Sequence, residues 1–184
     1  MRIVGGKYAG RSLVSPKDSR VRPTAEAVRD KILRTLAPDL EGARVLDLFA
    51  GTGALGLEAL SRGAKSADFV ETRPSSLHAL RANVALLRMR DKTRIFKRDA
   101  LPFAEALTEG LYDIAFVDPP YESKMLDRVI DAWMARKFSR ILIAEHVSGH
   151  ELPKATRWIR FEDTTVSIYR VEPTNSVEPP SSPG

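Results

Sequence analysis

The sequence contains no cysteine and only three histidines, and these shortages exclude several kinds of chemistry. Without cysteine there is no disulfide framework, no thiol nucleophile and no thiolate ligand for a metal. No apolar run approaches the roughly 20 residues that a membrane span needs. The opening residues, MRIVGGKYAG, lack the apolar region of a signal peptide. We therefore expect a cytoplasmic protein that uses neither a membrane nor a metal site.

The remaining composition is that of an ordinary globular protein. The chain has 184 residues, of which 43% are hydrophobic and 29% are charged. This length suits one domain with a short appendage, and nothing in the pattern suggests an obligate dimer, so we expect a monomer.

The net charge of +5 is concentrated near the N-terminus. Residues 1–35 hold nine basic and three acidic side chains, whereas the other 149 residues hold 20 basic and 21 acidic ones. A basic segment interleaved with glycine and Tyr8 is typical of contact with a nucleic-acid backbone, although a solvated basic face explains a charge run equally well. The candidate phosphate contacts are Lys7, Arg11, Arg20 and Arg22.

The order of β-prone and helical segments predicts the fold. Residues 2–14 suggest a β-hairpin, and residues 24–36 a helix that Thr24 caps and Pro38 stops. Strands and helices then alternate, which is typical of a mostly parallel sheet with helices on both faces. The expected strands are 44–49, 66–71, 93–100, 112–121 and 140–146, with an antiparallel edge from 156–161 and 164–171; the expected helices are 54–62, 74–89, 101–109 and 123–136.

These segments predict three parts of the chain. Residues 1–37 form a basic extension of hairpin, loop and helix, and residues 38–171 form the α/β domain with seven strands. Residues 172–184 are rich in proline and serine, a composition typical of a disordered tail.

Polar groups and glycines follow four expected strands, where ligands bind in open parallel sheets. Residues 51–56 read G-T-G-A-L-G, and a glycine allows the main chain to approach a ligand closely. Glu71 lies at the spacing from which a carboxylate can bind both ribose hydroxyls. Asp99 can accept a hydrogen bond from an adenine amine. The candidate cofactor residues are Asp47, Phe49, Ala50, Gly51, Gly53, Glu71, Asp99 and Ala100.

These features suit any adenosine-containing cofactor, so they leave a dinucleotide and S-adenosylmethionine both open. A dinucleotide needs bare amides around its pyrophosphate. Asp47 precedes the glycine turn by four residues, where a carboxylate could instead face the amino group of a methionine moiety.

Residues 118–121 read D-P-P-Y, and they give a more specific indication. In an exocyclic base amine the nitrogen lone pair is delocalised into the ring. Hydrogen bonds to the Asp118 carboxylate and the Pro119 carbonyl would aim that lone pair at an activated methyl group. Pro119 and Pro120 fix φ and hold these acceptors in place, and Tyr121 offers a face on which an unstacked base can lie.

Each feature alone has an ordinary structural explanation: a turn, a solvated acid or a change of chain direction. Compatible groups at four successive strand ends favour a site.

The sequence resembles class I S-adenosylmethionine-dependent methyltransferases, and more closely the RsmD-type 16S rRNA guanine-N2 methyltransferases. The similar stretches are RIVGGKYAGRSL, VRPTAEAVRDKIL, VLDLFAGTGALGLEALSRGA and DIAFVDPPY.

The resemblance implies a Rossmann-like fold, S-adenosylmethionine as cofactor, and as substrate a guanine in a loop of 16S rRNA within an assembling small ribosomal subunit. It implies cofactor contacts by Phe49, Gly51, Gly53, Glu71 and Asp99, and target-amine contacts by residues 118–121. The segment FEDTTVSIYR departs from the family pattern, because Glu162, Asp163 and Thr164 stand where a glycine is expected.

Three other functions stay open at this stage. One is methyl transfer to adenine-N6 or to a protein glutamine, although no target-recognition region is evident and the glutamine enzymes usually carry Asn in place of Asp118. Another is a non-catalytic RNA-binding module, which would not need the D-P-P-Y segment. The last is a dinucleotide enzyme, for which no histidine lies at any of the first four strand ends.

Overall fold

The computed structural model describes residues 1–16, 26–120 and 124–171. One mixed sheet in the order β3-β2-β1-β4-β5-β7-β6 forms its centre. The strands are β1 (Arg44–Leu48), β2 (Ser66–Val70), β3 (Thr93–Phe96), β4 (Tyr112–Val117), β5 (Ser139–Val147), β6 (Arg157–Arg160) and β7 (Thr164–Arg170). The first five pair in parallel, and β7 pairs antiparallel with both β5 and β6. The predicted Rossmann-like sheet with an antiparallel C-terminal edge is confirmed.

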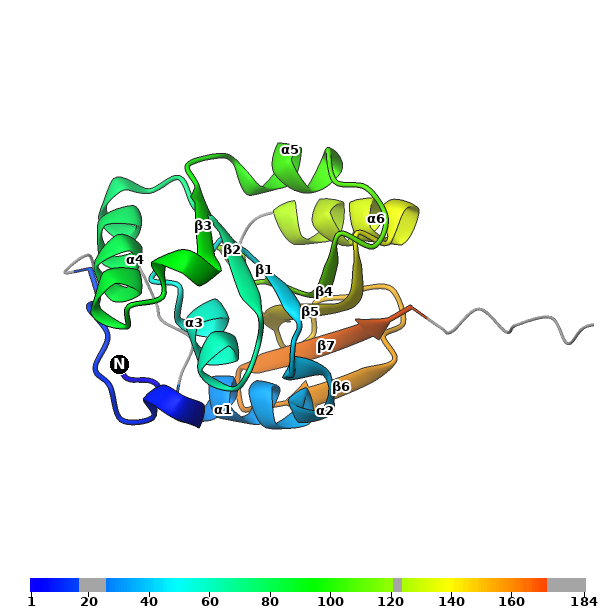
Figure 1. Ribbon diagram of the computed structural model, residues 1–184. Coiled ribbons are helices and arrows are strands. Elements are labelled where there is room, and N and C mark those ends of the chain that lie inside the picture. The colour runs from blue at the N-terminus through cyan, green and yellow to red at the C-terminus, as the bar shows by residue number, and fades with distance from the viewer. Residues whose placement is uncertain (17–25, 121–123, 172–184) are drawn as a thin grey trace, which may run out of the picture.

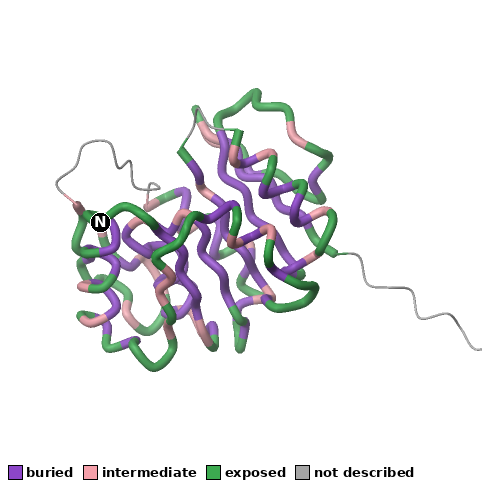
Figure 2. Tube along the Cα trace, turned by 90° about the horizontal axis from the view of Figure 1, so that it is seen from above, coloured by how far each residue is buried: buried purple, intermediate pink, exposed green. Residues whose placement is uncertain are grey.

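Helices cover both faces of this sheet (Figure 1). Two helices lie on one face, and four lie on the other together with the N-terminal residues Ile3 and Leu13. The first face carries α5 (Ala100–Glu105) and α6 (Met125–Arg136); the second carries α1 (Glu26–Thr35), α2 (Ala37–Leu40), α3 (Ala54–Ser61) and α4 (Pro74–Leu86). In Figure 2 the strands form a buried central band with exposed segments around it. Among the described residues, no helix is both long and apolar enough to span a bilayer.

The predicted N-terminal hairpin is present as an antiparallel bridge between Arg2 and Ser12, closed by the 3₁₀ turn η1 (Gly6–Tyr8). It packs against α3 through the buried carboxylate of Glu58. That group accepts from Val4 N at 2.9 Å and Gly5 N at 2.6 Å, and it pairs with the buried Arg29 guanidinium at 3.2 Å. The N-terminal segment therefore shares its core with the sheet.

Several expected boundaries were wrong. Pro38 follows the end of α1, but it also lies in the first turn of α2, because proline is favoured where a helix amide has no intrahelical partner. β3 ends at Phe96, and α5 begins at Ala100 and ends at Glu105. Asp99 caps that helix, since its carboxylate accepts from Leu101 N at 3.0 Å. The proposed boundary between 37 and 38 falls inside α2 and stays a prediction, whereas Thr24 and the tail 172–184 lie outside the described residues.

Candidate active site

A cavity of about 670 Å³ opens beyond the carboxyl ends of the central strands. This is the edge at which parallel α/β sheets bind ligands, and the volume is within the range of small-molecule sites. Ten of the predicted site residues line it: Asp47, Phe49, Ala50, Gly51, Glu71, Asp99, Ala100, Asp118, Pro119 and Pro120. Residues predicted from four strand ends therefore lie around one cavity. Tyr121 lies outside the described residues.

The Glu71 carboxylate organises the turn after β1. One of its oxygens accepts from Gly51 N at 2.8 Å, and the other accepts from Thr72 N and Arg73 N, both at 2.7 Å. Phe49, which precedes the turn, has a φ of 60°, a backbone conformation that residues other than glycine rarely adopt. Because a carboxylate already accepts from the Gly51 amide, a pyrophosphate at this turn would meet negative charge where a dinucleotide site offers bare amides.

Gly53 differs in its surroundings from the other candidate cofactor residues. It does not line the cavity, and its own amide donates to Ala50 O at 2.7 Å. A Cβ at Gly53 would lie 2.4 Å from Leu80 Cδ1, inside the core, whereas the nearest atom to a Cβ at Gly51 would be Phe49 O at 4.0 Å. Both glycines have positive φ, a conformation that favours glycine. Within the G-x-G pattern, Gly51 lies at the cavity, whereas Gly53 is required by packing in the core.

Asp47 is buried in β1 and lines the cavity. Its carboxylate accepts from Gly56 N at 3.0 Å in the first turns of α3. Burial, and to a smaller degree the nearby charge of Glu71, raise the pKa of Asp47 to about 8, although the Gly56 hydrogen bond acts in the opposite direction. A positively charged group entering the cavity beside Asp47 would favour its ionised form.

Asp99 and Ala100 lie at the start of α5, on the rim of the cavity. The hydrogen bond from Leu101 N fixes the orientation of the Asp99 carboxylate. A carboxylate has further lone pairs, so this cap is compatible with accepting an adenine amine. Ala100 is buried and also lines the cavity.

Asp118 and Pro119 follow directly after β4, in the middle of the sheet. Leu48 of β1 and Ala144 of β5 both pair with Val117, so the Asp-Pro-Pro segment lies between the glycine turn and the end of β5. Pro119 is buried and Asp118 is half-buried, and both line the cavity. This places a carboxylate and a neighbouring main-chain carbonyl beside the proposed cofactor residues.

Several cavity residues were not predicted from the sequence, including charged side chains and an aromatic ring. Arg73 and Arg98 are exposed, Glu145 is buried in β5, and Phe161 is half-buried in the turn between β6 and β7. The turn between β6 and β7 is distant from the other site residues in the sequence. It reaches the cavity because β7 pairs antiparallel with β5 and β6 pairs antiparallel with β7. Glu162, Asp163 and Thr164, the departure from the expected pattern, line the same cavity.

The cavity lining is strongly acidic. Among the described residues it includes seven carboxylates and two arginines. The carboxylates are Asp47, Glu71, Asp99, Asp118, Glu145, Glu162 and Asp163. Such a lining favours a cationic ligand over a polyphosphate. The parts of the chain that the structure describes contain no group of three or more potential ligands arranged for a metal ion.

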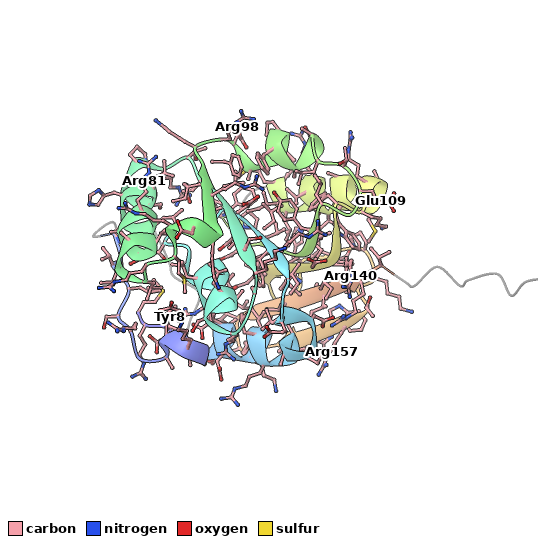
Figure 3. The ribbon with its side chains drawn as sticks, viewed as in Figure 1. Tyr8, Arg81, Arg98, Glu109, Arg140 and Arg157 are labelled. Atoms are coloured by element: carbon pink, nitrogen blue, oxygen red, sulfur yellow. The ribbon has the colours of Figure 1, made fainter. Side chains whose placement is uncertain are left out.

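The predicted phosphate contacts occupy different places. Lys7 and Arg11 are exposed on the N-terminal segment, and Arg20 and Arg22 lie outside the described residues. The amide of Tyr8 donates to Ser61 Oγ at 2.9 Å, so η1 lies at the end of α3 opposite the glycine turn. Figure 3 shows this separation, with Tyr8 near α1 and Arg98 close to the start of α5.

The other end of the N-terminal segment approaches the cavity. The buried Asn83 side chain accepts from Val14 N at 2.7 Å and donates to Val14 O and Thr52 O, both at 3.0 Å. The side-chain amide of Asn83 thus joins the basic N-terminal segment to the turn that lines the cavity. This contact gives the N-terminal segment a fixed position relative to the site.

Comparison with known proteins agrees with the geometry. A family model described as "Conserved hypothetical protein 95" matches residues 1–167. YlbH of Bacillus subtilis is 33% identical over 181 residues, which are 92% of this chain and 98% of that protein. Ribosomal RNA small subunit methyltransferase D of Escherichia coli K12 is 38% identical over 140 residues, covering 73% of this chain and 70% of that one. This chain belongs to the RsmD-type methyltransferase family.

A solved structure supports the assignment to the RsmD-type family. The Escherichia coli protein described as "Putative methyltransferase yhhF" superimposes with a TM-score of 0.81 at 31% identity, and the match covers 92% of this chain and 97% of that one. The resemblance expected from the sequence motifs is therefore confirmed over nearly the whole described chain.

Proposed function

We propose that this protein transfers a methyl group from S-adenosylmethionine to the exocyclic N2 amine of a guanine in small-subunit rRNA. The observation that carries the proposal is the Asp118-Pro119 corner beside an acidic cavity that the glycine turn and Glu71 line. The names of the curated relatives, which include ribosomal RNA small subunit methyltransferase D, support rRNA as the substrate class.

S-adenosylmethionine is the cofactor that these residues fit. Glu71 would bind the ribose hydroxyls, Asp99 the adenine amine, and Asp47 the amino group of the methionine part. The open space over Gly51 allows main-chain approach, and the carboxylates suit the positive charges on the sulfonium and the amino group. When bound, the cofactor supplies a methyl group that is already activated by its sulfonium, so no strong general base is required of the protein.

The residues of the chain orient the acceptor. The Asp118 carboxylate and the Pro119 carbonyl would accept the two N–H bonds of the amine and direct its lone pair toward the methyl carbon. A rigid proline corner holds these acceptors before the base arrives, which favours reaction by positioning.

The base must leave its stack to reach this depth, so the target is a flipped-out or loop nucleotide. Arg73 and Arg98 on the rim, with Lys7, Arg11, Arg20 and Arg22 from the N-terminal segment, would bind the surrounding phosphates. An assembling small subunit as partner, a monomeric enzyme and a cytoplasmic location stay predictions.

Two measurements test the proposal. Small-subunit rRNA from a strain lacking the gene is treated with the purified protein and S-adenosylmethionine, and methylated nucleotides are mapped by mass spectrometry. We expect N2-methylguanosine at one site; methyl transfer only to adenine-N6 or only to protein would contradict the guanine assignment. Isothermal titration should show S-adenosylhomocysteine binding, and NADH binding in its place would contradict the cofactor.

A further inference from the structure

Glu145 is a buried carboxylate at the catalytic edge of the sheet for which cofactor binding and amine orientation leave no role. Its exposed fraction is 6%, and it lines the main cavity. It also lines a smaller hollow beside Pro119 and Pro120. A buried carboxylate that lines a cavity can accept a hydrogen bond from a ligand that enters it.

The register of the sheet places Glu145 beside the Asp-Pro-Pro corner. Val117 of β4 pairs with Ala144 of β5, so Asp118 and Glu145 each follow one residue later at the same level. Val117 and Ala144 belong to the cluster on the α5–α6 face, so strand alternation directs Glu145 to the opposite face, which it shares with Asp47 of β1. Both residues line the cavity.

Guanine presents two kinds of donor along its Watson–Crick edge. The N2 amine is flanked by N1–H, which also donates, whereas 2-aminopurine carries the same amine but has an acceptor at N1. If Asp118 and the Pro119 carbonyl accept from the amine, N1 is the next polar atom along that edge. A carboxylate beside Asp118 and Pro119 would attract the N1–H of guanine and repel the N1 lone pair of 2-aminopurine.

We propose that Glu145 is the residue that selects guanine, by accepting a hydrogen bond from N1–H of the target base. This inference rests on the proposed function and adds its specificity determinant. A buried acceptor left facing another acceptor is unfavourable, so sites of this kind reject an analogue that lacks the donor. The selectivity then comes from the protein pocket itself, separately from the RNA sequence around the target.

The test compares two RNA substrates that differ only at the target base, guanine or 2-aminopurine, with kcat/KM for methyl transfer as the readout. The wild-type protein should prefer guanine about 10- to 100-fold, the value of one good hydrogen bond to a charged group. In Glu145→Gln the amide can donate to the N1 acceptor of 2-aminopurine. We therefore expect the preference to fall at least about tenfold, with a higher rate on 2-aminopurine than the wild type shows.

Two variants serve as controls. Glu109→Gln changes an exposed carboxylate on the loop after α5 (Figure 3) and should leave the preference unchanged. Glu145→Asp keeps a carboxylate and should retain a preference for guanine. S-adenosylhomocysteine affinity reports whether each variant is folded and should stay near the wild-type value.

An unchanged guanine preference in a folded Glu145→Gln protein would overturn the inference. So would an equal loss of rate on both substrates, which is the result expected of a merely structural residue. If Glu145→Gln does not fold, the rates of the wild-type protein on the two RNAs provide the test. Equal wild-type rates on guanine and 2-aminopurine would also overturn the inference. The proposed function fails separately, in the case where the wild-type protein methylates no guanine N2 at all.

Discussion

The backbone amide of Gly51 donates a hydrogen bond of 2.8 Å to the carboxylate of Glu71, which lies 20 residues further along the chain. This bond joins the ends of two neighbouring strands, β1 and β2, at the point where the cavity begins. It fixes the Glu71 carboxylate before any ligand binds, since Thr72 N and Arg73 N hold its other oxygen. The turn is therefore preorganised for a group that carries hydroxyls or positive charge.

Alanine at the two glycines should separate ligand approach from packing. Gly51→Ala places a Cβ no closer than 4.0 Å to any neighbouring atom, so it should cost only about 1 kcal/mol in the free energy of unfolding, from its positive φ. S-adenosylhomocysteine affinity should fall at least about tenfold, because a rigid group now occupies the binding surface. Denaturant unfolding and isothermal titration measure the two effects.

Gly53→Ala should show the opposite pattern. Its Cβ would lie 2.4 Å from Leu80 Cδ1 at a φ of 77°, so we expect a loss of about 2–4 kcal/mol in the free energy of unfolding. Gly110→Ala is the control for backbone strain alone, because its φ of 69° is similar and nothing lies within 4 Å. Equal effects of the Gly51 and Gly53 variants on stability would contradict these separate roles.

Asp47 should make the stability of the protein depend on pH. Its pKa is about 8 when folded and 3.8 in an unperturbed chain, so the folded state binds the extra proton between these values. The free energy of unfolding then falls as pH rises through that window, by up to about 1.4 kcal/mol per pH unit from this group. Asp47→Asn removes the titration and retains an oxygen that can accept from Gly56 N.

The gain in Tm from Asp47→Asn should therefore be larger at pH 8 than at pH 5, as measured by calorimetry on both proteins. Comparing variant with wild type at each pH cancels the other titrating groups. A gain that is the same at both values would show that Asp47 is ionised throughout. The variant should also lose affinity for S-adenosylhomocysteine, because the amino group would no longer face a carboxylate.

Local patterns predicted the sheet and several of the residues that line the cavity, because both depend on short segments. Gly51, Glu71, Asp99 and Asp118 each follow a strand, and parallel strands bring their carboxyl ends to one edge. Glu145 and Phe161 could not be found in this way. Glu145 lies within the apolar segment that predicts β5, so the local pattern does not mark it as a site residue. Phe161 reaches the cavity only because β6 and β7 run back along the sheet. The role of Gly53 depends on a contact with Leu80, which no local pattern shows.

RNA binding should draw on both the cavity rim and the N-terminal segment. Arg98→Ala on the cavity rim and Lys7→Ala in η1 should each weaken RNA affinity. Each should also lower the magnitude of the salt slope, which is the slope of log affinity against log salt concentration, by about 1, the effect of losing one phosphate contact. Arg157→Ala, on the exposed edge strand β6, is the matched control and should leave the slope unchanged. Filter binding at several salt concentrations provides the measurement. A slope altered only by Arg98→Ala would limit the RNA path to the cavity rim.

Asp118 should matter for methyl transfer far more than for cofactor binding. Asp118→Ala removes one of the two acceptors that orient the amine, so kcat should fall at least about 10²-fold, in the range of other positioning and electrostatic groups. S-adenosylhomocysteine affinity should stay within about threefold of the wild-type value, because the ribose and adenine contacts proposed above do not involve this residue. Asp113→Ala changes another carboxylate of β4, one that lies near the opposite end of the strand and pairs with Arg44, and it should leave kcat unchanged. Equal losses of cofactor affinity and rate in Asp118→Ala would show that this carboxylate holds the cofactor and does not orient the amine.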